Sequence, residues 1–396
     1  MVGSESRYQA WLEARGRAGL RRGLTAISAP DARTIQVGPR SFINFASNDY
    51  LALRFHPALV EQACAWAKSH GAGSGASRLV AGNLDLFAPI EAKIAKLKGK
   101  PAALLMASGF QANAAVLQAL LDRRVLDAEP LVFADRLNHA SMHFGCRAAG
   151  IDQIRYRHAD ASHLGELLLK HEDDARPKFI LTESVFSMDG DVAPIAELAA
   201  LAGEHEACLV VDDAHATGIL GPGGVGLSAG ADIVIGTFSK ALGGFGAYVA
   251  CLTEMRDYLV NRCSGLIYST ALPPPVLGAI DAALDLVPHM EGDRAYVSQL
   301  AQHFRAEANA RGFNTGASCT QIVPVIVGDN DAALTLSGKL RDAGLWATAI
   351  RPPTVPAGTA RVRLAFTRAH QASDIDLLLG ALGQSVPVPA ATASAL

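Results

Sequence analysis

The sequence predicts an α/β protein in which a mostly parallel sheet is flanked by helices and followed by a smaller C-terminal α+β domain. Short apolar runs rich in β-branched residues, such as 208–211 and 233–235, are typical of strands buried on both faces. Helically spaced apolar residues recur between such runs, and this alternation implies parallel strands joined by right-handed crossovers. After three consecutive prolines at 273–275 the pattern changes, which indicates a nearby domain boundary.

Further elements are expected along the chain. Residues 8–23 predict a short amphipathic helix, and residues 42–45 predict a strand that leads into a polar turn. Other strands are expected at 103–106, 131–134, 179–182 and 247–252. Beyond the prolines we expect a long helix over 276–311, strand 322–327, helix 331–343, strands 346–350 and 361–366, and a last helix to residue 382.

The expected elements divide the 396 residues into four parts. These are an N-terminal helix-and-strand segment (1–45), a large α/β domain (46–275), a small α+β domain (276–382) and a tail (383–396). The tail is rich in Ala, Pro, Val and Ser and is expected to be disordered.

Composition excludes several classes of protein. Hydrophobic residues make up 50% and charged residues 18% of the chain, so it can bury a large core. The net charge of −3 gives no basic footprint for nucleic acid. The six cysteines form no Cys-x-x-Cys pair and predict reduced thiols. Because no signal peptide or membrane span is recognisable, a cytoplasmic enzyme is expected.

Polar residues follow two of the predicted strands where ligands bind in open α/β sheets. The first strand is followed by Asp212, Asp213 and His215, and the second by Thr237 and Lys240. Pyridoxal phosphate needs a lysine for its Schiff base and an acid that keeps its pyridine nitrogen protonated. A lone lysine is usually a surface charge, but Lys240 with Asp212 favours the cofactor. Since side chains alternate along a strand, Asp213 is expected to point away from it.

Other residues could complete such a site. Gly109 and Phe110 begin a predicted helix, whose N-terminal amides suit a phosphate. His139 follows a strand and could stack on the ring, although a local hydrogen bond is the simpler role. Ser187 and His215 could donate to the phenolate oxygen of the cofactor, and Thr237 is placed to reach its phosphate.

Three patterns predict other chemistry weakly. Residues 221–226 match Gly-x-Gly-x-x-Gly but contain a proline and precede a poor helix start, so a dinucleotide site is not expected. The Gly-rich stretch 71–82 could cradle an anion or serve as a flexible connection. His139 and His143 have the spacing of helical zinc ligands but lack the Glu of His-Glu-x-x-His, and no metal site is expected.

Six motifs, at 47–51, 107–110, 135–141, 185–190, 212–215 and 237–240, resemble one enzyme family. They resemble the α-oxoamine synthases, a branch of the fold-type I pyridoxal-phosphate enzymes, and the similarity extends from about residue 8 to 382. The stretches 326–330 and 349–363 resemble the branch that acts in biotin biosynthesis. This resemblance implies the decarboxylative condensation of L-alanine with a pimeloyl thioester, catalysed by a homodimer with shared active sites.

The resemblance also implies roles for individual residues. Catalysis falls to Lys240, His139 and Asp212. The cofactor would be held by these three together with Gly109, Phe110, Ser187, His215, Thr237, Ser269 and Thr270, the last two reaching the partner subunit's cofactor. Substrate would be bound by His139, Arg21, Asn48, Thr354 and Arg363. Arg361 shares a strand face with Arg363, but the resemblance favours Arg363 for the amino-acid carboxylate.

The chain departs from the family pattern at three positions, and two other functions stay open. Ala52 and Ser239 stand where relatives often have Gly, and Phe87 stands where they often have His. A glycine-using member of the same family is the main alternative, although the 351–354 stretch favours alanine. A catalytically silent binding protein is the other alternative. The retention of Lys240, Asp212, His215 and Arg363 argues against it. The acyl carrier could be coenzyme A or acyl-carrier protein.

Overall fold

The computed structural model describes residues 2–383, and the chain forms two compact units. The large unit comprises Asn48–Ser187 and Asp191–Tyr296. The small unit comprises, within the described residues, 2–47, the short segment Met188–Gly190, and 297–383. None of the helices within residues 2–383 is long and apolar enough to cross a membrane.

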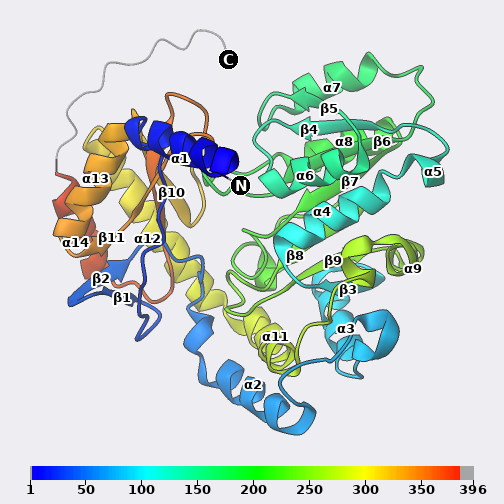
Figure 1. The fold of residues 1–396 in the computed structure, drawn as a ribbon, viewed down its shortest axis with the longest axis horizontal. Helices are drawn as coiled ribbons and strands as arrows, with labels where there is room; N and C mark the ends of the chain where they lie inside the picture. The colour runs from blue at the N-terminus through cyan, green and yellow to red at the C-terminus, as the bar shows by residue number, and fades with distance from the viewer. Residues whose placement is uncertain (1, 384–396) are drawn as a thin grey trace. The chain divides into compact units, whose positions relative to one another are not determined.

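A seven-stranded sheet runs through the large unit in the order β3-β9-β8-β7-β6-β4-β5 (Figure 1). The strands from β8 to β5 are parallel, whereas β9 is antiparallel to both of its neighbours. This confirms the predicted mostly parallel sheet. The strands are β3 Ala102–Met106, β4 Leu131–Asp135, β5 Gln153–Tyr156, β6 Lys178–Glu183, β7 Ala207–Asp212, β8 Ile233–Thr237 and β9 Ala247–Cys251.

Helices precede and connect these strands, and several begin at a polar cap. The Ser108 hydroxyl accepts from the backbone N–H of Gln111 before α4, and the Asp160 carboxylate accepts from that of His163 at the start of α7. The helices are α2 Pro57–His70, α3 Phe87–Lys98, α4 Gly109–Leu120, α5 Arg123–Leu126, α6 Ala140–Ala149, α7 Ala161–Leu169, α8 Ile195–Glu204, α9 Thr253–Arg262, α10 Ser264–Ile267 and α11 Pro274–Leu286.

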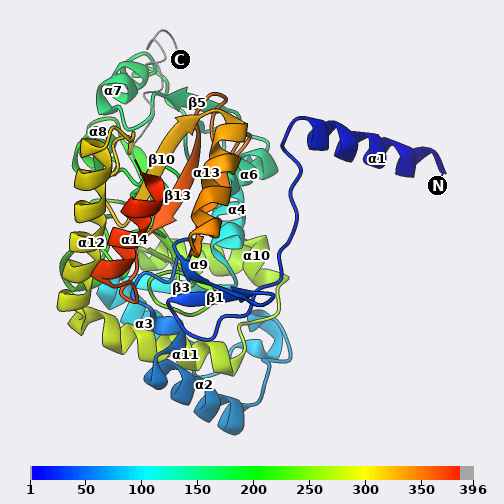
Figure 2. The ribbon, with the colours of Figure 1, turned by 90° about the vertical axis from the view of Figure 1, so that its left-hand side faces the viewer.

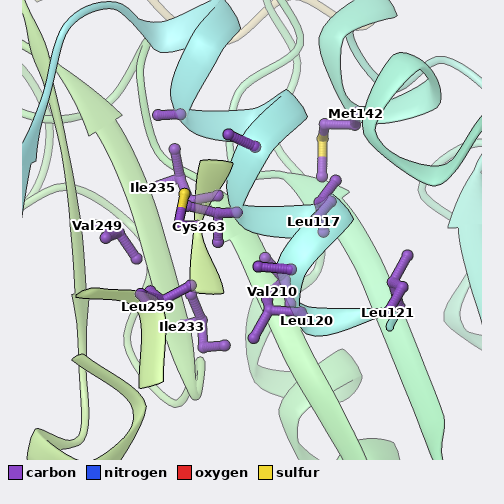
Figure 3. Packing of buried hydrophobic residues seen from close by; sticks show 14 of the residues in the cluster. Leu117, Leu120, Leu121, Met142, Val210, Ile233, Ile235, Val249, Leu259 and Cys263 are labelled. Carbon is purple, nitrogen blue, oxygen red and sulfur yellow. The ribbon is translucent and has the colours of Figure 1, made fainter. Parts of the chain in front are cut away.

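Both faces of this sheet are buried. On one face, Val210 of β7 and Ile235 of β8 join a cluster with Leu117 of α4 and Met142 of α6, as Figure 3 shows. The intervening strand residues, such as Val211, are equally buried on the opposite face. Continuous apolar strands are therefore explained by helices on both sides, as the sequence predicted.

The small unit contains two three-stranded sheets. One has the order β1-β2-β11 and the other the antiparallel order β10-β13-β12. Figure 2 shows α13 and α14 beside β10 and β13. The elements are α1 Val2–Arg17, β1 Thr34–Val37, β2 Arg40–Asn44, β10 Ile322–Gly328, α13 Asn330–Asp342, β11 Leu345–Trp346, β12 Thr348–Ile350, β13 Ala360–Ala365 and α14 Ala372–Leu382. Helix α12, Glu291–Ala310, spans the boundary between the units.

Three expected elements were wrong in detail. The first helix covers Val2–Arg17 rather than 8–23, and the chain turns at Gly19, which has a positive φ of 64°. The expected helix over 276–311 is broken at Pro288, because proline has no N–H to continue the helix. The expected strand 346–350 is divided between two sheets at Ala347.

The units also differ from the expected domains 1–45, 46–275 and 276–382. The N-terminal residues group with the C-terminal part because β2 pairs in parallel with β11. Helix α11 groups with the large unit because it packs closely on α2. A Cβ added at Gly278 would lie 2.8 Å from the backbone oxygen of Gln62. Residues 384–396 of the expected tail lie outside the described residues.

Candidate functional site

The carboxyl ends of β7 and β8 lie side by side, with Asp212 in register with Ile235. Asp212 ends β7 and is 7% exposed, and Lys240 lies in a bend three residues after β8. Both charges act on His139: desolvation lowers its pKa, the Asp212 carboxylate opposes this, and the Lys240 ammonium adds to it. The structure therefore brings these three predicted residues into one electrostatic site.

Asp212 is held by neutral donors. Its Oδ2 accepts from Nδ2 of Asn113 at 2.6 Å, and its Oδ1 accepts from the backbone N–H of Ala214 at 3.0 Å. Asp213 instead pairs with the ammonium of Lys98 at 2.6 Å. Because Lys98 ends α3 whereas Asn113 belongs to α4, the two carboxylates face different helices, as the alternation of side chains predicts.

The N-terminus of α4 meets the end of β8. A Cβ added at Gly109 would lie 3.7 Å from Cβ of Thr237, so a longer side chain would enter this space. The Thr237 hydroxyl donates to the backbone oxygen of Gly246 at 2.7 Å. Phe110, next on the helix, is half exposed, and its ring packs against Phe144. Helix amides beside a hydroxyl form a group that could hold a phosphate.

Two histidines of the site are fixed by hydrogen bonds. His139 is the N-cap of α6, and its Nδ1 lies 2.6 Å from Oγ of Ser141. Nδ1 of His215 lies 2.7 Å from the hydroxyl of Tyr50. That hydroxyl is also 3.2 Å from Oδ1 of Asn48, so Asn48 is linked to His215 through Tyr50.

The imidazole of His158 links the end of β4 to the segment that follows β6. Nδ1 of His158 lies 3.0 Å from a carboxylate oxygen of Asp135, and its Nε2 lies 2.8 Å from one of Asp191. Desolvation lowers the pKa of His158, but hydrogen bonds to both carboxylates outweigh it and raise the value to about 10. The first turn leads to His139, and the second carries Ser187.

Ser269 and Thr270, expected at a partner's cofactor, lie near the start of α4 of their own chain. Nε2 of Gln111 donates to the Ser269 hydroxyl at 2.7 Å. Thr270 forms a β-bridge with Ser77, next to the π-helical turn Arg78–Gly82.

The remaining expected substrate residues belong to the small unit. Arg21 lines a pocket together with Arg351 and Thr354, and the neighbouring Arg22 donates to the Thr354 hydroxyl at 2.9 Å. These residues carry positive charge around one cavity of the small unit.

Both arginines of β13 are buried. Arg361 forms an ion pair with Asp189 and donates to the backbone oxygen of Met188 at 3.1 Å. Arg363 is 7% exposed and lies two residues further along the same strand. The ion pair gives Arg361 a structural partner of its own.

The three departures from the family pattern have local explanations or costs. Phe87 is buried at the start of α3, with the guanidinium of Arg78 over its ring. The Ser239 hydroxyl lies 2.8 Å from that of Thr237. Ala52 has a φ of 58°, a left-handed conformation that glycine adopts more easily.

Several residues of the site were missed from the sequence. Asn113 lies four residues after Gly109, and this helical spacing would have placed it on the same face. Glu183 is in register with Asp212 on the adjacent strand. Burial, together with the charge of Asp212, raises the pKa of Glu183 well above its usual value.

This chain is similar to known proteins over nearly its whole length. Residues 40–382 match the family model of aminotransferase class I and II. The chain is 54% identical over 380 residues to 8-amino-7-oxononanoate synthase of Gluconacetobacter diazotrophicus, covering 95% of this chain and 96% of the relative. It is 43% identical over 382 residues to the enzyme of that name from Anaeromyxobacter dehalogenans, covering 95% and 94%.

Solved structures share the fold. A structure of SPT with its pyridoxal-phosphate internal aldimine has a TM-score of 0.87 at 25% identity, covering 96% of this chain and 97% of that chain. Serine palmitoyltransferase of Sphingomonas wittichii gives 0.88 at 25% identity, with the same coverage. The crystal structure of 8-amino-7-oxononanoate synthase from Francisella tularensis gives 0.73 at 26% identity, covering 86% and 96%.

Proposed function

Because the chain belongs to the aminotransferase class I and II family, and within it to the 8-amino-7-oxononanoate synthases, we propose that it condenses L-alanine with a pimeloyl thioester. The products are 8-amino-7-oxononanoate, carbon dioxide and the free carrier thiol, and the reaction serves biotin biosynthesis. Pyridoxal phosphate is the cofactor. The observation that carries this proposal is the placement of Asp212 and Lys240 at the ends of adjacent strands in a chain 54% identical to such an enzyme.

The residues present suit this cofactor. The described hydrogen bonds to the buried Asp212 come from neutral donors, so its charge can serve a protonated pyridine nitrogen. Gly109 would offer helix amides to the phosphate, Thr237 would offer its hydroxyl by turning it from the backbone oxygen of Gly246, and Lys240 would offer an amine. When bound, pyridoxal phosphate supplies the electron sink that stabilises negative charge at Cα of alanine. His139 would stack on the ring.

The protein residues then divide the remaining work. Arg363 holds the alanine carboxylate with two parallel hydrogen bonds, and this grip orients the Cα–H bond. Lys240 takes the Cα proton at Nζ and returns a proton at the end of the reaction. Ser187 and His215 would hold the phenolate oxygen of the cofactor, while Arg21, Asn48 and Thr354 would contact substrate.

A homodimer with shared sites is part of the proposal. Three exposed apolar side chains near Thr270 support it. Tyr268 lies two residues before Thr270, while Leu79 and Val80 follow Ser77, which forms a β-bridge with Thr270. Exposed apolar groups beside an expected site are typical of a surface that a second copy covers. All six cysteines are free thiols, which supports a reducing compartment such as the cytoplasm.

The test is an assay of purified protein with alanine or glycine and with pimeloyl, succinyl or acetyl thioesters, read by product mass. We expect 8-amino-7-oxononanoate from alanine and the pimeloyl thioester. Faster turnover of glycine with a shorter acyl group would instead show a glycine-using member of the family. Comparing coenzyme A with acyl-carrier protein as carrier identifies the natural thioester.

A further inference from the structure

A chain of hydrogen bonds joins Asp212 to His139 through two other side chains. Nδ2 of Asn113 lies 2.6 Å from Oδ2 of Asp212 and 3.0 Å from Oγ of Ser141. Oγ of Ser141 lies in turn 2.6 Å from Nδ1 of His139. The connection runs inside the large unit, from the end of β7 through α4 to the start of α6.

The chemistry of these groups gives one consistent set of hydrogen-bond directions, in which Nδ1 of His139 accepts. The amide of Asn113 has two hydrogens on Nδ2, so it can donate to the carboxylate and to the serine hydroxyl at once. Because Ser141 accepts from Asn113, its own hydrogen can be donated to Nδ1 of His139. The backbone N–H of Ser141 faces the same nitrogen at 3.4 Å. Nδ1 is therefore an acceptor, and the proton of the neutral ring is on Nε2.

The orientation of the Asn113 amide supports this assignment. The opposite orientation would place its oxygen against the Asp212 carboxylate and the amide would lose a charge-assisted hydrogen bond. Within the described residues, Oδ1 of Asn113 is buried without a hydrogen-bond partner. An unpaired buried oxygen is costly, so the two bonds donated by Nδ2 must compensate for it.

The scaffold around the connection is closely packed. Asn113 is 2% exposed and Ser141 is fully buried. Helices α4 and α6 approach so closely that a Cβ added at Gly145 would lie 2.9 Å from the backbone oxygen of Asn113. Such packing leaves the two side chains little freedom to reorient.

We propose that Asn113 and Ser141 are positioning residues that orient the Asp212 carboxylate and hold His139 as the neutral Nε2–H tautomer. The same chain of hydrogen bonds thereby orients both the Asp212 carboxylate, which serves the pyridine nitrogen, and the His139 imidazole, which stacks on the cofactor. This inference rests on the proposed function, which gives His139 and Asp212 these roles. The lowered pKa of His139, caused first by desolvation, agrees with a neutral ring.

The tautomer can be measured directly. Histidine labelled with ¹⁵N in the cofactor-free protein distinguishes a protonated from an unprotonated Nδ1, and His139→Gln identifies the resonance. We expect an unprotonated Nδ1 in the wild type near pH 8 and a mixture of tautomers in Ser141→Ala. A protonated Nδ1 in the wild type, or the same tautomer in both proteins, would overturn the assignment.

The second measurement tests whether Asn113 and Ser141 act together. Asn113→Leu and Ser141→Ala should each slow the exchange of alanine Cα–H for deuterium by roughly 10-fold, the effect of losing a hydrogen bond near a charged group. The double variant should be little slower than the slower single variant, because residues that act as one chain are not additive. Effects that simply multiply would contradict the proposal.

Gln118→Leu is the matched control. It removes an amide from the same helix, one that accepts from Ser264, and should leave both measurements unchanged. If Asn113→Leu does not fold, Asn113→Asp replaces it, since a second carboxylate beside Asp212 should also slow the exchange. Neither readout uses an acyl thioester, so failure here leaves the proposed condensation intact, and failure of the condensation leaves these results interpretable.

Discussion

The end of β7 presents two consecutive aspartates to opposite environments. On the α3 side, Asp213 is fully buried and pairs with Lys98, whose side chain is also inaccessible. The same carboxylate accepts from the hydroxyl of Ser184 at 2.6 Å and that of Thr217 at 2.9 Å. On the α4 side, Asp212 accepts only from neutral groups in its described hydrogen bonds.

The difference between the two aspartates indicates that one stabilises the fold and the other serves catalysis. Asp213 has a permanent cation and no spare space, because a Cβ added at Gly226 would lie 1.8 Å from its carboxylate oxygen. Asp212 has donors that orient it but do not neutralise it, which suits a carboxylate that must serve a cationic ring nitrogen. We infer that the α4 side carries catalysis and the α3 side carries folding stability.

The largest expected effect is the loss of Lys240. Lys240→Ala should abolish turnover and the absorbance of covalently bound cofactor, because Lys98 is committed to Asp213 and cannot replace it. Absorbance spectra before and after borohydride treatment give the readout. A variant that still traps the cofactor at the wild-type level would show that another amine serves.

The next largest effect is expected for the replacement of Lys98. Lys98→Met leaves the Asp213 carboxylate buried without its cation and should lower the free energy of unfolding by about 3–5 kcal/mol. The folded fraction should still exchange alanine Cα–H. Lys93→Met is the control, since Lys93 pairs with Asp281 at a more exposed position and such pairs contribute ~0–1 kcal/mol. Equal urea midpoints for the two variants would refute a stabilising role.

A smaller effect is expected at Arg361 and Arg363, the two arginines of β13. Arg363→Lys should weaken alanine binding by roughly 10- to 100-fold, because lysine cannot form two parallel hydrogen bonds with a carboxylate. Arg361→Lys should mainly perturb the pairing with Asp189. Alanine titrations followed by cofactor absorbance decide between them, and the opposite pattern would assign the carboxylate to Arg361.

A pH dependence of stability is expected at His158. Its pKa is raised from 6.5 to about 10 in the folded protein, so its charge stabilises the fold fully below pH 6.5. This contribution is lost as the pH rises through 10, with a slope of at most about 1.4 kcal/mol per pH unit. Unfolding of the wild type and His158→Gln between pH 6 and 10 should show the difference in slope, and parallel curves would exclude it.

The sequence predicted much of the large unit because local signals were strong there. The strands ending at Asp212 and Thr237 are continuous apolar runs bounded by polar residues, and both were found at their expected places. Spacing alone also placed Asp212 and Asp213 on different sides.

Long-range partners could not be predicted. Lys98 lies 115 residues from Asp213, and no local pattern marks it as the cation of that carboxylate. The strand expected at 346–350 was divided because its first half pairs with β2, about 300 residues earlier, whereas its second half pairs with the neighbouring β13 in another sheet. Asn113 carried a helical-spacing signal, but its contact with Asp212 depends on how α4 packs on the sheet.

The comparison of Asp212→Asn with Asp213→Asn tests the central claim most directly. For each variant, alanine Cα–H exchange at saturating pyridoxal phosphate and the free energy of unfolding are measured. Asp212→Asn should lose about 10²–10³ in exchange rate at nearly unchanged stability. Asp213→Asn should lose stability while its folded fraction exchanges at nearly the wild-type rate. Near-normal exchange in Asp212→Asn, or a larger loss of exchange in folded Asp213→Asn, would contradict the division between the two sides of the sheet.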